Sequence, residues 1–217
     1  PEYADTFVGR GLAYEGLGKW EVALENYNKA VTLWGGQSTT DRDASLKPDI
    51  KTYNGVNPYA LTFRGNVLNK LGNCDQALVD FDVASSLFIG LRDIPRFSDA
   101  RANYALTLYN VGREVESVKV MKDVIRKNPG YADMHVALAA DSWSKGNYVN
   151  ALKEWQFTCD SIAVGCDAYK DLNWVKNIRR WPDSLTKKLG QFLTRELPDG
   201  VLGDPNAPRA PPPSVSS

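Results

Sequence analysis

The stretch that decides the fold runs from Pro58 to Leu91 and reads PYALTFRGNVLNKLGNCDQALVDFDVASSLFIGL. It contains two helical patterns separated by Leu71-Gly72-Asn73, which is typical of a turn. Small residues in both patterns would let two antiparallel helices approach closely, and large residues would fill the seam to the next hairpin. The small residues are Gly65, Ala77 and Ala84, and the large ones are Leu68, Leu71 and Phe81. The stretch therefore predicts one helical hairpin.

The same turn recurs at Leu17-Gly18-Lys19, Val111-Gly112-Arg113 and Lys145-Gly146-Asn147. Successive turn glycines are 54, 40 and 34 residues apart. The last spacing equals the tetratricopeptide (TPR) period of 34 residues, and the other two exceed it by 20 and 6. We therefore expect four TPR-like hairpins in residues 1–165, with inserts at 38–57 and 92–97. The hairpins occupy residues 4–37, 58–91, 98–131 and 132–165.

This pattern predicts an all-α fold, a TPR-type right-handed solenoid of about four helical hairpins. Residues 166–197 are expected to form capping helices, because a solenoid needs a terminal unit to cover its open end. Within them, one helical face carries Leu185, Leu189, Phe192 and Leu193. A detachable amphipathic helix that binds a partner or a membrane is the alternative. Residues 198–217 hold 6 of the 12 prolines, so an extended tail is expected there.

The insert 38–57 is mostly polar, contains Pro48 and is flanked by Gly35-Gly36. These features predict a surface loop. A loop of this length is either a binding element or simply tolerated between hairpins, and the residues do not decide between the two.

Composition excludes several classes of function. The chain has 217 residues with 26 Lys and Arg against 26 Asp and Glu, and this zero net charge argues against nucleic-acid binding. His135 is the single histidine, so a multi-histidine metal site is excluded, and a satisfied structural role is expected for it. No cofactor motif, metal motif or nucleophile–base pair is recognisable, which predicts a protein that is not an enzyme. No apolar run is long enough for a transmembrane helix. Because the chain starts with Pro1, we expect a processed or trimmed form.

The predicted binding site is the concave groove lined by the first helix of each hairpin. Aromatic faces there would bury apolar side chains of an extended peptide, and asparagine amides would bond its backbone. The alternative is that the protein's own inserts or tail fill the groove. The groove residues are Leu12, Tyr59, Asn66, Asn69, Leu106, Tyr109, Asn110, Val136 and Trp143.

Three cysteines are present. Cys74 is expected to be a buried free thiol. Cys159 and Cys166 are seven residues apart, at a helix end and in the following loop, so they form a disulfide if the loop turns back. Two unpaired thiols in a reducing compartment are the alternative.

The C-terminal part resembles plastid TPR proteins of plants, algae and related cyanobacterial proteins. So does the N-terminal segment Thr6 to Ala13, followed by Glu15-Gly16-Leu17-Gly18. The chain departs from the family pattern at Asp183, where a second proline is expected, and in its Pro-rich tail. The C-terminal residues that carry the resemblance are Trp155, Cys159, Gly165-Cys166, Tyr169, Asp171, Trp174 and Ile178-Arg179-Arg180-Trp181-Pro182.

The resemblance implies a chloroplast protein without enzymatic activity that is associated with the thylakoid. A disulfide between Cys159 and Cys166 would suit the oxidising lumen, which favours the lumenal over the stromal side, although the sequence does not decide between them. Its partners would be subunits of a photosynthetic membrane complex, which it would serve as an accessory subunit or assembly factor. A soluble peptide-binding adaptor or co-chaperone is the alternative. Arg179, Arg180 and Trp181 are candidate partner contacts, or else the arginines pair with Asp171 and Asp183.

Overall fold

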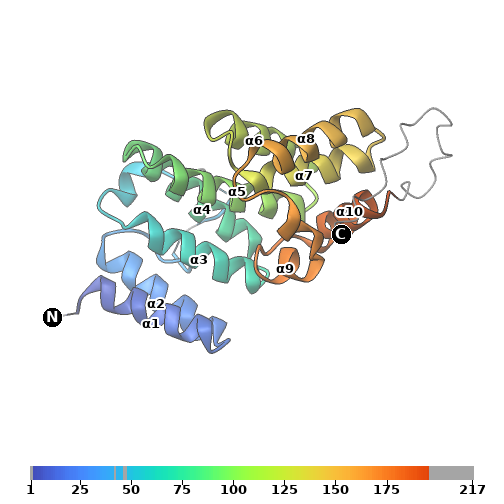
Figure 1. The fold of residues 1–217 in the computed structure, drawn as a ribbon. Helices are drawn as coiled ribbons and strands as arrows, with labels where there is room; N and C mark the ends of the chain where they lie inside the picture. The colour runs from blue at the N-terminus through green and yellow to red at the C-terminus, as the bar shows by residue number, and fades with distance from the viewer. Residues whose placement is uncertain (1, 42, 46–47, 196–217) are drawn as a thin grey trace. The chain divides into compact units, whose positions relative to one another are not determined.

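In a computed structural model, which describes residues 2–41, 43–45 and 48–195, the chain is all-α. The helices follow one another as antiparallel hairpins, each joined by a short turn (Figure 1). The described residues contain ten α-helices: α1 Ala4–Gly16, α2 Trp20–Leu33, α3 Pro58–Lys70, α4 Cys74–Gly90, α5 Ile94–Asn110, α6 Glu114–Lys127, α7 Ala132–Ser144, α8 Tyr148–Ser161, α9 Leu172–Asn177 and α10 Asp183–Thr194. They also contain two 3₁₀ helices, η1 Ile50–Tyr53 and η2 Asp167–Lys170.

The chain divides into two compact units, one up to Pro129 and one from Gly130 onward. Unit 1 holds the hairpins α1/α2, α3/α4 and α5/α6, and unit 2 holds the hairpin α7/α8 with α9 and α10. The sequence predicted a division after residue 165, with the fourth hairpin grouped with the first three. In the structure that hairpin is grouped with the C-terminal helices, because α10 packs on α7.

The predicted hairpin turns are confirmed. Gly72 has a φ of +80°, in the left-handed region that side chains rarely adopt, and Gly18, Gly112 and Gly146 share this conformation. Beyond Gly72, the amide of Asn73 donates to the carbonyl of Leu68 at 2.9 Å. The glycine therefore ends one helix and lets the chain reverse into the next.

Close approach of paired helices depends on two other glycines. A Cβ added to Gly11 would lie 2.6 Å from the Cε1 atom of Tyr27, and one added to Gly65 would lie 2.7 Å from Cε1 of Phe81. Both rings are fully buried. The small and large positions that predicted these hairpins are thus the positions where their helices touch.

The core of unit 1 also contains an ion pair. Arg64 of α3 donates from Nε and Nη2 to the two carboxylate oxygens of Asp80 of α4, each at 2.8 Å, and both side chains are fully buried. Nη1 of Arg64 donates to the side-chain oxygen of Asn28 at 3.0 Å and to the carbonyl of Gln37 at 2.9 Å. The guanidinium therefore ties the first two hairpins together, at the residue that precedes the 38–57 insert.

The 38–57 insert is not wholly a surface loop. Tyr53, at the end of η1, is fully buried, and Val56 is 4% exposed. Both belong to a core cluster with Val31 of α2 and Leu61 of α3. The mostly polar composition of the insert predicted a surface loop throughout. The few apolar residues near its end instead fix that end to the core.

The predicted insert at 92–97 is wrong, because α5 begins at Ile94, four residues before the predicted start of the third hairpin. The side chain of Asp93 caps this helix by accepting from the backbone amide of Arg96 at 3.1 Å. Pro95 stands in its first turn, where a missing N–H is tolerated.

The capping helix expected in the C-terminal region is α10. It packs on α7 within unit 2, with Leu185, Leu189 and Phe192 fully buried and Leu193 half-buried. Among the described residues, no helix is long and apolar enough to cross a membrane. The tail predicted at 198–217 lies outside the described residues.

Candidate functional site

The first helices of the second and third hairpins, α3 and α5, carry a row of polar and aromatic side chains in unit 1. Residues of α3 contact residues of α5 at an almost constant separation along the chain. Tyr59 meets Arg96 and Asn66 meets Asn103, both 37 residues apart, and Asn69 meets Thr107, 38 residues apart. This constant register means that the two helices form one continuous surface, which we call the α3–α5 surface.

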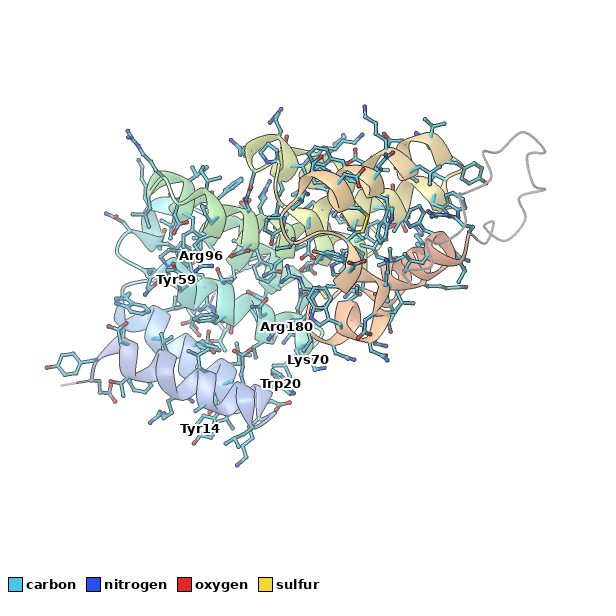
Figure 2. All side chains as sticks on the ribbon, viewed as in Figure 1. Tyr14, Trp20, Tyr59, Lys70, Arg96 and Arg180 are labelled. Carbon is cyan, nitrogen blue, oxygen red and sulfur yellow. A yellow bond between two sulfur atoms is a disulfide. The ribbon has the colours of Figure 1, made fainter. Side chains whose placement is uncertain are left out.

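At one end of this surface, Tyr59 and Arg96 lie together (Figure 2). Nε of Arg96 donates to the hydroxyl of Tyr59 at 3.2 Å, and Nη1 donates to a carboxylate oxygen of Asp99 at 3.1 Å. These hydrogen bonds, first to Tyr59 and then to Asp99, raise the pKa of Arg96 above its ordinary value. Arg96 and Asp99 are both about half exposed, so this end presents an ion pair beside the aromatic ring of Tyr59.

The middle of the α3–α5 surface is made of amides. Nδ2 of Asn103 donates to Oδ1 of Asn66 at 3.2 Å, and Nδ2 of Asn69 donates to the hydroxyl of Thr107 at 2.6 Å. Oδ1 of Asn69 is buried without a hydrogen-bond partner among the described residues. Half-buried amides with spare donors and acceptors suit the backbone of an extended peptide.

Lys70 and Asn110 lie at the other end of the α3–α5 surface. The ammonium of Lys70 lies 5.6 Å from the centre of the Trp20 ring (Figure 2). Asn110 is exposed, and its Nδ2 lies 3.6 Å from the sulfur of Cys74. Cys74 is half-buried, not buried as the sequence predicted, because it is the first residue of α4.

Other predicted groove residues are packed in the core. Leu106, Tyr109, Val136 and Trp143 are 4%, 1%, 0% and 7% exposed. The Trp143 ring contacts Phe192 of the capping helix α10, with ring centres 5.5 Å apart. In unit 2, therefore, the protein's own capping helix covers part of the face that the sequence assigned to a partner. Of the predicted groove residues, those that stay exposed or half-buried are Leu12, Tyr59, Asn66, Asn69 and Asn110.

Arg96 and Thr107 were missed by the sequence mapping. Arg96 fell in the predicted insert 92–97, and Thr107 was not among the predicted groove residues. Asp93 followed by Pro95 was the available signal, because a capping aspartate before a proline is typical of a helix start. An earlier start of the helix places Arg96 in its first turn, within reach of Tyr59.

Asp133 of α7 is the centre of a buried polar cluster in unit 2. Arg179 donates to it from Nε at 2.9 Å and also from Nη2, and the hydroxyl of Tyr169 donates to its Oδ1 at 2.6 Å. Burial and then the charge of Asp133 raise the pKa of Tyr169 well above its ordinary value. Burial lowers the pKa of Arg179. The hydrogen bond to Asp133 and the negative charge of Asp133 outweigh burial, so the pKa of Arg179 is raised.

This cluster corrects the expectation for Arg179 and Trp181. Arg179 pairs with Asp133, not with Asp171 or Asp183, because the loop after α9 returns it to α7. Trp181 is 3% exposed and packs near Tyr169, so it is not an available partner contact. Arg180 alone of the three is exposed, with a φ of +60°.

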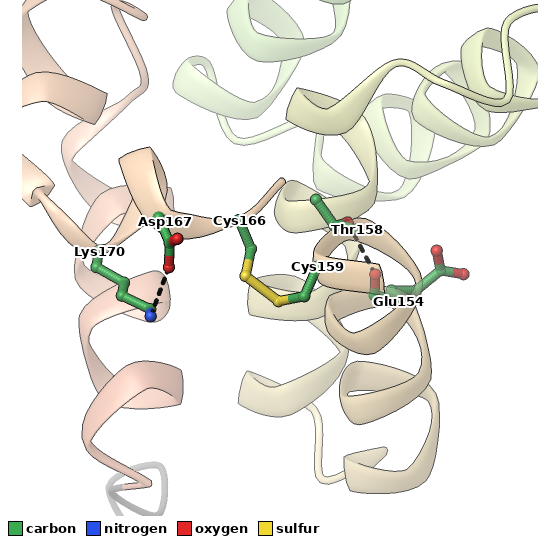
Figure 3. Close-up of a disulfide and its surroundings, with 6 residues drawn as sticks. All are labelled: Glu154, Thr158, Cys159, Cys166, Asp167 and Lys170. Carbon is green, nitrogen blue, oxygen red and sulfur yellow. Dashed lines mark hydrogen bonds and ion pairs between the residues drawn. A yellow bond between two sulfur atoms is a disulfide. The ribbon is translucent and has the colours of Figure 1, made fainter. Parts of the chain in front are cut away.

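A disulfide joins Cys159 at the end of α8 to Cys166 just before η2 (Figure 3). The two Cα atoms are 4.7 Å apart. Gly165 has a φ of +63°, and its amide donates to the carbonyl of Ile162 at 2.8 Å, which turns the chain back. The disulfide thus fastens α8 to the segment that carries Tyr169.

The single histidine, His135 of α7, pairs with a carboxylate of α8. Nδ1 of His135 lies 2.6 Å from a carboxylate oxygen of Glu154, and the ring packs on Phe157. Within the described part of the chain, no group of three or more His, Cys, Asp or Glu residues could hold a metal ion.

No protein-family model matches the chain. No curated protein matches it either. Among solved structures it is similar to YrrB, described as a TPR protein with an unusual peptide-binding site, at 16% sequence identity. The similarity covers 85% of this chain and 90% of YrrB, with a TM-score of 0.27. The order and packing of the helices in this chain are what make its fold TPR-like.

Proposed function

We propose that the protein is a non-enzymatic scaffold that binds a partner protein through the α3–α5 surface. One observation carries this proposal: amides and an aromatic residue line the first helices of two successive hairpins in constant register, from Tyr59–Arg96 to Asn69–Thr107. An extended peptide lying along this register would meet an aromatic ring, an ion pair and amide groups in turn.

The test uses a photocrosslinking amino acid at position 59. We expect it to capture a partner from the source extract, and Asn66→Ala with Asn69→Ala to reduce the yield at least several-fold while helicity stays unchanged. The matched control places the crosslinker at Val115, an exposed apolar residue of α6 outside the surface. Equal capture from positions 59 and 115 would contradict the proposal.

The finer proposal is that the partner is a photosystem complex of the thylakoid, which the protein serves as an accessory subunit or assembly factor. Its support is the resemblance to plastid TPR proteins at both ends of the chain, above all in Ile178 to Pro182. Crosslinking in isolated thylakoids from the source organism tests it. Recovery of photosystem subunits is the expected result, and migration only as free protein would contradict it.

The lumenal side of the thylakoid is part of this proposal. The disulfide between Cys159 and Cys166 supports it, since disulfides persist in oxidising compartments. Protease protection of the protein in intact thylakoids is expected. Digestion before the membranes are opened would place it on the stromal side.

A soluble adaptor that acts transiently on client proteins is the alternative function. Such an adaptor would give several partners in weak, rapidly exchanging complexes. An accessory subunit would give one stable set of partners that survives purification.

A further inference from the structure

One side of α8 carries a shallow hollow, and the described residues that line it all belong to this helix. Six of them recur at helical spacing along one face: Val149, Leu152, Lys153, Gln156, Phe157 and Asp160. The opposite face packs on α7 and buries Ala151 and Thr158. The helix therefore has one face in the fold and one facing outward.

The outward face exposes apolar side chains. Val149 is 72% exposed and Phe157 is 39% exposed. Val164, in the turn just beyond the helix, is also 72% exposed. Apolar residues gathered along one exposed stripe are typical of a protein–protein contact.

This face carries one positively and one negatively charged residue, placed on opposite sides of its centre. Lys153 and Asp160 lie seven residues apart, about 10 Å along the axis, on either side of Gln156 and Phe157. Within the described residues, neither has an ion-pair partner. An antiparallel copy of the same helix presents the complementary order of charges.

We propose that α8 pairs antiparallel with α8 of a second copy of this chain, about a two-fold axis between Gln156 and Phe157. Lys153 then faces Asp160 of the partner subunit, and the symmetry makes this ion pair twice. Val149 faces Val164 of the partner subunit, which covers the exposed apolar ends of the stripe. A contact built on one helix is small, so the dimer dissociates on dilution and weakens with salt.

Charge reversal tests this pairing by sedimentation equilibrium at protein concentrations up to about 1 mM, which reaches millimolar dissociation constants. Lys153→Asp alone and Asp160→Lys alone each place like charges opposite one another. Each should weaken self-association about tenfold or more. The double variant restores both pairs and should associate like the wild type. Lys122 is an exposed residue of α6. The variant Lys122→Asp is the matched control and should dimerise like the wild type.

Mixing the two single variants gives the sharpest readout. The mixture should form a heterodimer, because each copy then offers the charge that the other lacks. Circular dichroism checks that each variant is folded, and the neutral variants Lys153→Gln and Asp160→Asn replace any that is not. A wild type that stays monomeric at about 1 mM overturns the proposal. So does a dimer that the single reversals leave intact, or one that neither the double variant nor the mixture restores.

Discussion

Arg64 and Asp80 form a fully buried ion pair in which both carboxylate oxygens accept from one guanidinium. Burying two charges costs solvation, which the pair recovers only because the remaining donor, Nη1, also bonds Asn28 and Gln37. The first and second hairpins therefore share one polar junction, next to the start of the long insert. Breaking it should affect both hairpins.

Asp80→Ala should lower the free energy of unfolding by about 3–5 kcal/mol, because it leaves the Arg64 charge buried without its partner. Chemical denaturation followed by circular dichroism measures this. The apolar replacement Arg64→Met with Asp80→Leu should recover most of the loss. Glu116→Ala, which breaks the exposed pair with Arg113, is the control and should change stability little. Similar stability of Asp80→Ala and the wild type would refute a structural role for the pair.

Gly65→Ala should destabilise the protein by about 1–3 kcal/mol, since the new methyl group would lie 2.7 Å from the buried Phe81 ring. Gly9→Ala in α1 is the matched control, because nothing lies within 4 Å of its added Cβ. There the higher helix propensity of alanine should stabilise by up to about 1 kcal/mol. Thermal unfolding of the two variants should thus shift in opposite directions. Shifts in the same direction would show that the close approach of α3 and α4 is not tight.

Alkaline pH should destabilise the protein through Tyr169. Its pKa is raised in the folded state, so below about pH 10, where the unfolded tyrosine also stays protonated, its contribution is fully present. Above that pH only the unfolded state loses the proton, and stability falls by up to about 1.4 kcal/mol per pH unit. Denaturation of the wild type and Tyr169→Phe between about pH 9 and 11 should show a steeper fall for the wild type. Parallel curves would contradict the buried hydrogen bond to Asp133.

Reduction of the disulfide should lower stability by about 2 kcal/mol, the chain-entropy effect of a closure across seven residues. Melting with and without a phosphine reductant measures the change. Cys159→Ser with Cys166→Ser should match the reduced wild type and be insensitive to the reductant. Cys74→Ser is the control and should remain sensitive, since Cys74 is a free thiol.

The hairpins were predictable from local sequence. Turn glycines such as Gly72 need a left-handed backbone, and pairs such as Gly65 with Phe81 record where two helices touch. Both signals depend on residues close together in the chain and recur with a regular period. They locate the turns without any knowledge of distant contacts, but they do not locate helix starts between repeats, as Ile94 shows.

The binding surface was predictable only in part. Tyr59, Asn66 and Asn69 keep accessible atoms, whereas Tyr109 and Trp143 occupy equally suitable repeat positions and are buried. The position of a residue in the repeat specifies the side of the helix on which it lies. It does not specify whether another part of the protein packs over that side. In unit 2 the cover is α10, whose Phe192 lies against Trp143.

The sequence by itself determined the helical hairpins, their turns and the small residues between paired helices, because these depend on short-range backbone geometry and size. Tertiary structure alone decided that Arg64 bonds Asn28 and Asp80, and that Arg179 turns to Asp133 instead of a partner. These contacts join residues 16 to 46 positions apart. A buried charge takes whichever opposite charge the packed helices bring within reach, and nothing local in the chain specifies that partner.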